Sequence, residues 1–427
     1  MNIRKKAAEL LATLEREGGF ANLMLTDGLL AAAGEEAPLL TALFYGAVER
    51  RLSLDFAIAT LSGRSISEVD SHAKQLLRLG LYQMYFMHTP PYAAVNETVA
   101  LGENKAEKGF LNAVLREAVR RGERPLPDEG KIARYLSVRE SFPQATVKRF
   151  LSLFGQADTE ALLAAYNRVA PLTLRLVRGR REDYIRRLAA LGIEAERTPY
   201  APRGIRVLSA VSVKALPGFD TGEFFIQDEA SQLAVAALDA QRGQRVIDVC
   251  ACPGGKTAGA LADREGEGES FAFDLHRSKL PLIEGTLGRL GFSATLGELD
   301  AAQGRADLFD TAERVICDVP CSGLGVLGKK PDLRYRPIAE ALPALQYDIL
   351  RTSARYLKKE GILVYSTCTL LPEENGENVA RFLEEHPHFV AEDFSFGALH
   401  SEKGQLTLLP FRHGTDGFFI ARLRRIR

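Results

Sequence analysis

The order of strand-like and helix-like segments after about residue 223 is the feature that most constrains the fold. Short apolar runs with strand character occupy residues 245–250, 270–273, 294–296, 314–318 and 362–366, and helical patterns fill the intervals, as over 256–262 and 276–290. This alternation predicts a parallel sheet wrapped by helices on both faces. A last apolar segment, 417–423, is expected to be an edge strand of that sheet.

Residues 1–125 follow a helical pattern instead. Their apolar residues recur at helical spacing in two stripes, Leu10, Leu11 and Leu14, and then Leu39, Leu40, Leu43, Phe44 and Val48. The nearly all-apolar stretch over 76–82 predicts a buried central helix. We therefore expect a bundle of six or seven helices.

Residues 126–222 are expected to form a small helical and α/β accessory region. A segment rich in proline and glycine, 122–130, predicts the linker that precedes it. Helical patterns resume over 131–167, and strands are expected at 172–176 and 205–208 with a helix over 183–191 between them. The chain thus divides into three expected parts: 1–125, 126–222 and 223–427.

Composition and charge narrow the class of protein. Hydrophobic residues make up 46% of the chain and charged residues 26%, and 55 basic residues balance 55 acidic ones. These values predict a soluble globular protein in which any nucleic-acid contact comes from local basic patches. No apolar run has the length of a membrane span, and residues 1–17 mix charge with leucine, unlike a signal peptide. We expect a cytoplasmic protein without a membrane partner.

Each of the five expected parallel strands of the last part ends in residues that can carry chemistry. The first leads into Cys250 and a glycine turn, the second ends at Asp274, and the third ends near Asp300. The fourth leads through Asp318 to Cys321, and the fifth leads to Cys368. One such residue alone would be a turn or a cap. Because a parallel sheet binds ligands at the carboxyl ends of its strands, five of them together predict a ligand crevice.

The glycine turn favours a nucleoside with an amino-acid tail. A phosphate-binding loop would need glycine at position 250, where Cys250 stands, and the dinucleotide pattern G-x-G-x-x-G is absent. A helix that follows Gly254 can hold a carboxylate at its N-terminus. Asp274 lies 20 residues beyond Gly254, the distance at which an acidic residue binds ribose hydroxyls, and Asp300 is placed to face an adenine amino group. S-adenosylmethionine fits this pattern.

A zinc site is the alternative for the cysteines. The chain has five cysteines, all after residue 249, and an odd count argues against a disulfide scaffold. Cys250, Cys252, Cys317 and Cys321 could supply four thiolates, although their spacings differ from the usual C-x-x-C pairs. Cys317 would also point away from the crevice if Asp318 points into it. We therefore expect no metal.

A thiol in a methyl-transfer site has a chemical reason. Carbon 5 of cytosine is a poor nucleophile, and addition of a thiolate to carbon 6 gives it the electron density to attack a sulfonium methyl group. A carboxyl group near ring N3 and the exocyclic amine would stabilise the adduct, and Asp318 lies at the right strand end. Chemistry alone does not choose between Cys321 and Cys368 as the nucleophile.

Several sequence motifs resemble one known family. The runs DVCACPGGKT, DVPCSGLGV, YSTCTLLPEEN, FFIQDEASQL and GTDGFFIARL are similar to those of the RsmB/Sun/NOP family of RNA cytosine-5 methyltransferases, over nearly all of residues 126–427. The runs LLRLGLYQMYFMHTPPYAAVNETVAL and KGFLNAVLR resemble NusB-like RNA-binding domains. The resemblance implies an all-α NusB-like bundle, the accessory region and a Rossmann-like class I methyltransferase domain. It also implies S-adenosylmethionine as cofactor and 16S ribosomal RNA as partner.

The resemblance assigns roles residue by residue. It makes Cys368 the nucleophile, Cys321 the cysteine that helps release the methylated product, and Asp318 a contact of the target base. It places these residues in the cofactor pocket: Cys250, Ala251, Cys252, Pro253, Gly254, Gly255, Lys256, Asp274, Asp300 and Asp318. The family usually has alanine where Cys252 stands.

Three groups of basic residues predict an RNA-binding track: Arg116, Arg120, Arg121 and Arg124; Arg175, Arg178, Arg180 and Arg181; and Lys329, Lys330, Arg334 and Arg336. The target cytosine must be unstacked, so a loop or locally open RNA is expected as the substrate. We expect the protein to be a monomer. Two alternatives are a non-catalytic RNA-binding factor, disfavoured by the intact cysteine and glycine motifs, and a DNA cytosine methyltransferase, disfavoured by the NusB-like bundle. DNA enzymes use a Pro-Cys cysteine, as at Cys321.

Overall fold

The computed structural model describes residues 1–427, apart from the side chain of Asn22, and they form two compact units. The helical unit comprises residues 1–168 together with 327–337, and the α/β unit comprises 169–326 and 338–427. No helix of the described residues is long and apolar enough to cross a membrane.

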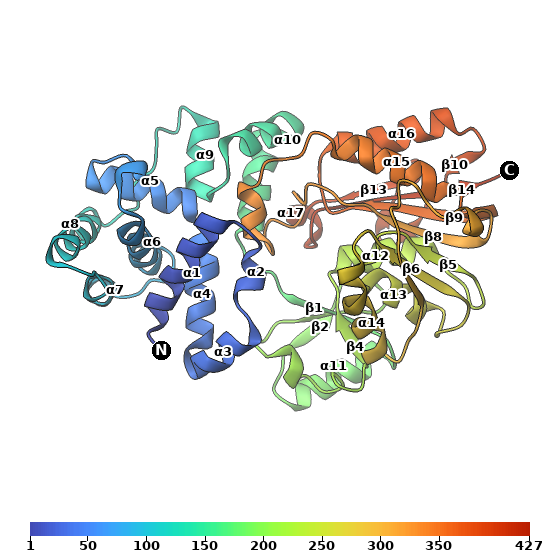
Figure 1. Ribbon diagram of the computed structural model, residues 1–427, viewed down its shortest axis with the longest axis horizontal. Helices are drawn as coiled ribbons and strands as arrows, with labels where there is room; N and C mark the ends of the chain where they lie inside the picture. Colours follow the sequence, from blue (N-terminus) through green and yellow to red (C-terminus); the bar gives the residue numbers. More distant parts are fainter. The chain divides into compact units, whose positions relative to one another are not determined.

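The helical unit confirms the expected bundle (Figure 1). Its helices are α1 (Ile3–Glu17), α2 (Ala21–Met24), α3 (Asp27–Ala33), α4 (Ala37–Glu49), α5 (Arg51–Ser62), α6 (Ser71–Tyr85), α7 (Pro91–Ala100) and α8 (Lys105–Arg121). Eight helices are described rather than six or seven, because the short α2 and α3 leave little periodic signal. Helix α6 is the central one, in contact with α1, α4, α5, α7 and α8. Side chains of Asn2, Asp70 and Asn104 cap α1, α6 and α8 by accepting from first-turn N–H groups.

Two later segments belong to the same unit. Helices α9 (Ile132–Glu140) and α10 (Gln144–Tyr166) follow the linker, and α9 packs on α5. The segment 327–337 contains the 3₁₀ helix η6 (Pro331–Tyr335), which packs on α4. We call 327–337 the strap, because the chain leaves the α/β unit after Val326 and re-enters it at Ile338.

The α/β unit contains two main sheets. A four-stranded antiparallel sheet has the order β2 (Ala195–Arg197), β3 (Gly204–Val207), β1 (Leu172–Leu176), β4 (Phe224–Ile226), with α11 (Arg181–Ala190) packed on β2 and β3. The large sheet has the order β10 (Phe389–Ala391), β14 (Phe418–Arg425), β9 (Leu357–Thr367), β8 (Ala312–Asp318), β5 (Val246–Asp248), β6 (Ser270–Asp274), β7 (Thr295–Glu298), and β13 (Gln405–Leu408) pairs with β14. A separate hairpin joins β11 (Ser395–Phe396) to β12 (Leu399–His400).

The large sheet is mixed, which corrects two expectations. Strands β5 to β9 are parallel, as predicted, but β14 runs antiparallel to β9. The segment 417–423 was expected at an edge, whereas β14 lies between β9 and β10. Its continuous apolar run fits this interior position, because both of its faces are covered.

Helices cover both faces of the large sheet (Figure 1). One layer contains α12 (Glu229–Leu238), α13 (Gly255–Asp263) and α14 (Leu280–Arg289), and the other contains α15 (Leu342–Ala354) and α16 (Gly376–Glu385). The side-chain period of two divides β9 between them: Ile362 and Val364 join the core cluster with α12, and Leu363 and Tyr365 join the cluster with α15 and α16. The arrangement is Rossmann-like.

The sheet has a topological switch point between β5 and β8. From β5 the chain moves outward to β6 and β7, and then returns to add β8 and β9 on the other side of β5. In sheets of this type the ligand crevice opens at the carboxyl ends of the two strands where the order reverses. The residues after β5 and β8 therefore line the expected ligand crevice.

Candidate functional site

The turn after β5 is shaped to present backbone N–H groups. Ala251 N donates to Phe273 O at 2.7 Å, and Gly254 N donates to Ala251 O at 2.6 Å. Gly254 has a φ of 101°, and a Cβ at this position would lie 3.3 Å from the Cα of Ile283. Glycine is needed here on both grounds. Because Gly254 caps α13 without a side chain, the first-turn N–H groups of α13 can bind an anion.

An ion pair spans the switch point. Lys256 Nζ lies 2.6 Å from Asp318 Oδ2, so the first turn of α13 is joined to the end of β8. Ser366 Oγ donates to Asp318 Oδ1 at 2.6 Å from the neighbouring strand β9. Burial by itself would lower the pKa of Lys256, but the charges of Asp318 and Asp248 raise it, so the amine keeps its proton.

A second carboxyl group lies beneath this pair. Asp248, at the end of β5, is 1% exposed and accepts a hydrogen bond from Thr257 Oγ1 at 2.7 Å. Burial raises the pKa of Asp248 to about 7, and the charge of Asp318 acts in the same direction. The site therefore holds a carboxyl group that changes its protonation near neutral pH.

The two cysteines of the predicted crevice lie together. The sulfur atoms of Cys321, after β8, and Cys368, after β9, are 3.2 Å apart and both residues are partly exposed. The hydrogen bond with Cys368 and burial raise the pKa of Cys321. Cys368 is also among the groups whose charge raises the pKa of Lys256. Two thiol groups and an ammonium group thus occupy one end of the sheet.

The predicted cofactor acids follow neighbouring strands. Asp274, 7% exposed at the end of β6, accepts from His276 N at 3.0 Å and lies 3.3 Å from Lys279 Nζ. Asp300, exposed two residues after β7, accepts from Ala302 N at 3.0 Å. The N–H of Leu299 donates to the carbonyl of Asp274, which ties the two strand ends together.

The cysteines considered for zinc do not come together as a set of ligands among the described residues. Cys317 is fully buried in the core cluster that includes α15 and α16, where burial raises its pKa to about 12. Cys321 faces Cys368 instead. Among the described residues, no three of these cysteines lie close enough together to share a metal ion. In the helical unit, the ligand atoms of His72, Glu103 and Glu107 do lie within 4.8 Å of one another.

Three arginines expected on the RNA track have structural roles, which corrects that expectation. Arg175 is 2% exposed and binds Asp263 at 2.7 Å, and Arg334 is 1% exposed inside the helical unit. Arg124 donates to Ser53 Oγ and to the carbonyl of Arg139. Among the other residues of the track, Arg116, Arg120, Arg121, Arg178, Arg180, Lys329 and Lys330 are exposed, whereas Arg181 and Arg336 are partly buried.

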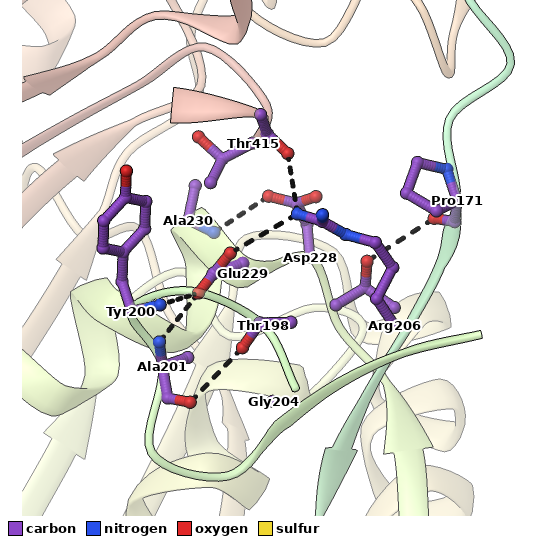
Figure 2. Close-up of polar contacts among 12 residues, drawn as sticks. Pro171, Thr198, Tyr200, Ala201, Gly204, Arg206, Asp228, Glu229, Ala230 and Thr415 are labelled. Atoms are coloured by element: carbon purple, nitrogen blue, oxygen red, sulfur yellow. Dashed lines mark hydrogen bonds and ion pairs between the residues drawn. The ribbon is translucent and has the colours of Figure 1, made fainter. Parts of the chain in front are cut away.

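Two of the sequence motifs support the site from behind. Figure 2 shows the start of α12. The FFIQDEASQL run begins with β4 and continues into this helix. Asp228 caps the helix by accepting from Ala230 N, and it also accepts from Asp416 N of the GTDGFFIARL run. Glu229 accepts from the N–H groups of Tyr200 and Ala201 (Figure 2).

The FFIQDEASQL run also contacts the glycine turn after β5. Gln227 Nε2 donates to the carbonyl of Gly255 at 3.1 Å, and Gln227 Oε1 accepts from the buried Arg175 at 3.3 Å. The small sheet and the start of α13 are thereby joined by buried polar contacts within the α/β unit. Sequence reasoning had not given Gln227 a role.

Comparisons with known proteins agree with this geometry. Residues 1–120 match the NusB family, 142–214 match the ferredoxin-like domain of RsmF/B-like methyltransferases, and 235–424 match 16S rRNA methyltransferase RsmB/F. The probable ribosomal RNA small subunit methyltransferase B of Bacillus subtilis is 34% identical over 99% of both chains. The ribosomal RNA small subunit methyltransferase B of Pseudomonas putida is also 34% identical, over 100% of this chain and 99% of the relative. The chain belongs to the RsmB family.

Membership in the RsmB family makes the chain an S-adenosylmethionine-dependent methyltransferase. A solved methyltransferase homolog from Pyrococcus horikoshii is 28% identical, covers 68% of this chain and 97% of its own, and superposes with a TM-score of 0.59. The uncapped start of α13 and the buried acceptor Asp274 fit the carboxylate tail and the ribose of this cofactor.

Proposed function

We propose that this protein methylates carbon 5 of a cytosine in 16S ribosomal RNA through a covalent adduct with Cys368. The observation that carries the proposal is the 3.2 Å approach of the Cys321 and Cys368 sulfur atoms beside the Lys256–Asp318 ion pair. The substrate class is supported by relatives that are named ribosomal RNA small subunit methyltransferase B.

The cofactor would lie across the ends of β5, β6 and β7. The first-turn N–H groups of α13 would bind its carboxylate, Asp274 its ribose hydroxyls, and Asp300 its adenine amino group. The remaining pocket residues, Cys250, Ala251, Cys252 and Pro253, form the turn that sets this N-terminus. S-adenosylmethionine, when bound, supplies an electrophilic methyl group.

The side chains divide the reaction between them. The sulfur of Cys368 forms a bond to carbon 6 of the cytosine, which makes carbon 5 nucleophilic. The carboxylate of Asp318, held by Lys256 and Ser366, accepts from the exocyclic amine of the base. After methyl transfer, a base takes the proton from carbon 5, the electron pair of that C–H bond restores the double bond between carbons 5 and 6, and the Cys368 sulfur leaves carbon 6 as a thiolate; Cys321 assists this elimination.

The proposal extends to the other parts of the chain. The NusB-like residues 1–125 would bind RNA weakly. The expected accessory region 126–222 is divided, because residues 126–168 belong to the helical unit and residues 169–222 to the α/β unit that contains the methyltransferase domain. The exposed basic residues of the track would contact phosphates of an unstacked RNA segment, so binding should weaken with salt. The protein would act as a monomer in the cytoplasm.

Trapping of the adduct tests the cysteine roles. The C368A protein should form neither methylated RNA nor an adduct, because no thiolate reaches carbon 6. The C321A protein should methylate but stall in elimination, so a protein–RNA complex should survive denaturing electrophoresis. C317A is the cysteine control and should methylate and release product as wild type does, because Cys317 lies in the buried core cluster and has no role in the site. An adduct lost in C321A and trapped in C368A would refute the assignment and indicate the chemistry of DNA enzymes.

A further inference from the structure

A buried polar cluster lies beside the loops of the two cysteines, and none of its residues belongs to the proposed cofactor pocket or base contact. It consists of Glu374 and Asn375, at the end of the YSTCTLLPEEN run, together with Gln346 of α15. Their exposed fractions are 1%, 4% and 0%. Buried carboxyl and amide groups of this kind are costly unless their hydrogen bonds are made, so the partners of each group indicate what the cluster does.

Glu374 and Gln346 hold the loop that carries Cys321. Glu374 Oε2 accepts from the N–H of Ser322 at 2.9 Å and from Gln346 Nε2 at 2.7 Å. The same Gln346 Nε2 donates to the carbonyl of Pro320 at 2.9 Å. The residues immediately before and after Cys321 are therefore both bound by this acid–amide pair.

Asn375 holds the strand end that carries Cys368. Its Oδ1 accepts from Thr367 Oγ1 at 2.5 Å, and its Nδ2 donates to the carbonyl of Thr369 at 3.0 Å. These two partners are the residues immediately before and after Cys368. Both threonines are fully buried, so solvent cannot replace a lost contact.

The two halves of the cluster are joined. Ser322 Oγ and Thr369 Oγ1 lie 2.7 Å apart, which links the residue after Cys321 to the residue after Cys368. Thr369 Oγ1 also lies 3.5 Å from Glu374 Oε1, a longer contact than those of Glu374 to the Cys321 loop. Each cysteine is thus held mainly by its own set of hydrogen bonds.

We infer that Glu374 and Asn375 are positioning residues with separate tasks: Glu374, with Gln346, places Cys321 for product release, and Asn375 places Cys368 for attack. The inference rests on the proposed function for the roles of the two cysteines. It follows that loss of one contact set should slow one half of the reaction and leave the other half intact.

The test measures the fraction of enzyme trapped as RNA adduct, the turnover rate and cofactor affinity in the full chain. E374M removes the acceptor oxygens at similar side-chain size, so the N–H of Ser322 loses its acceptor and Gln346, which binds the carbonyl of Pro320, loses its own partner. We expect turnover about tenfold to a hundredfold lower, as for a displaced reacting group, with an adduct that accumulates as in C321A. E374Q keeps an oxygen for the Ser322 N–H and should recover most of the turnover. N375D loses the donor to Thr369 and should lower the rate of adduct formation, with no accumulation.

Q346M provides a second route to the Cys321 loop from a different helix. It should accumulate adduct as E374M does, and it decides the matter if E374M fails to bind the cofactor. Adduct levels equal to wild type in Q346M, or the same phenotype in N375D and E374M, would overturn the inference. C321A is the parallel reference: if it traps no adduct, the proposed cysteine roles fail, whereas trapping by C321A without trapping by Q346M removes only the roles given to Glu374 and Gln346.

Discussion

The replacement of Arg334 by methionine should release the strap from the helical unit. The Arg334 side chain is fully buried, and its guanidinium lies 4.0 Å from the centre of the Phe142 ring. It donates to four acceptors between 2.9 and 3.3 Å, namely the carbonyls of Leu327, Glu49 and Tyr166 and the side-chain oxygen of Asn167. It also forms an ion pair of 3.1 Å with Glu49 Oε1. Methionine fills the volume but supplies no donor.

The magnitude follows from the groups left behind. Each buried acceptor without a donor costs about 1–3 kcal/mol, and loss of one partner of a buried ion pair costs about 3–5 kcal/mol in total. Burial lowers the pKa of Arg334, so keeping the charged guanidinium buried costs free energy. Removal of the charge in R334M recovers this cost and offsets part of the loss. We therefore expect the strap to lose about 3 kcal/mol of stability against local opening, roughly a hundredfold in its opening equilibrium.

Hydrogen exchange by mass spectrometry on the full-length protein measures this opening directly. Amides of 327–337 should exchange about a hundredfold faster in R334M, while amides of β5 to β7 should be unchanged. R336M is the comparison on the same strap: Arg336 is partly exposed, pairs with Asp332 at 3.2 Å and donates to the carbonyl of Gly19, so its loss should have a smaller effect than loss of the fully buried Arg334. Exchange in R334M within threefold of wild type, or equal effects of the two variants, would refute the reasoning.

Three further predictions concern the α/β unit. Asp274→Ala should weaken cofactor binding by about 1–3 kcal/mol, because ribose hydroxyls lose their acceptor, and calorimetry showing unchanged affinity would remove the assignment. Gly254→Ala should destabilise the protein by about 1–2 kcal/mol and weaken cofactor binding, because its φ of 101° is unfavourable with a Cβ; an unchanged melting temperature would contradict this. The raised pKa of Asp248, about 7 against 3.8, means that the folded chain binds a proton that the unfolded chain releases between these values, so the stability contributed by Asp248 falls as pH rises through this window. Between pH 5 and 8, the melting temperature of the Asp248→Asn protein should therefore fall less than that of wild type. Parallel plots of melting temperature against pH for the two proteins would show that Asp248 is not the group responsible.

Local sequence pattern predicted much of the catalytic half of the fold. The expected strand over 270–273 corresponds to β6, and the expected helix over 256–262 corresponds to α13. Such segments are recognisable because side chains on one face recur every two residues in a strand and every 3.6 residues in a helix. Both patterns are visible within a short stretch of sequence. The strand ends could then be placed together by the rule for parallel sheets alone.

Residues that are defined by distant partners escaped the sequence analysis. No role could be assigned to Glu374 from the sequence, because only the fold brings it to Ser322, 52 positions earlier in the chain. Arg334 looked like part of an exposed basic cluster, but its partner Glu49 lies 285 positions away. A weak signal for Glu374 did exist, since it lies in a motif of the family and has no role in the cofactor pocket.

The sequence by itself determined the order of helices and strands, the glycine turn, and the residue types at the strand ends, because each of these depends on neighbours along the chain. Only the tertiary structure decided that β14 lies inside the sheet, that α9, α10 and the strap belong with the helical bundle, and that Arg175 and Arg334 are buried. The physical reason is that burial and hydrogen-bond partners are set by contacts between segments far apart in the chain. The local sequence around an arginine does not show whether its side chain faces water or a buried carboxylate.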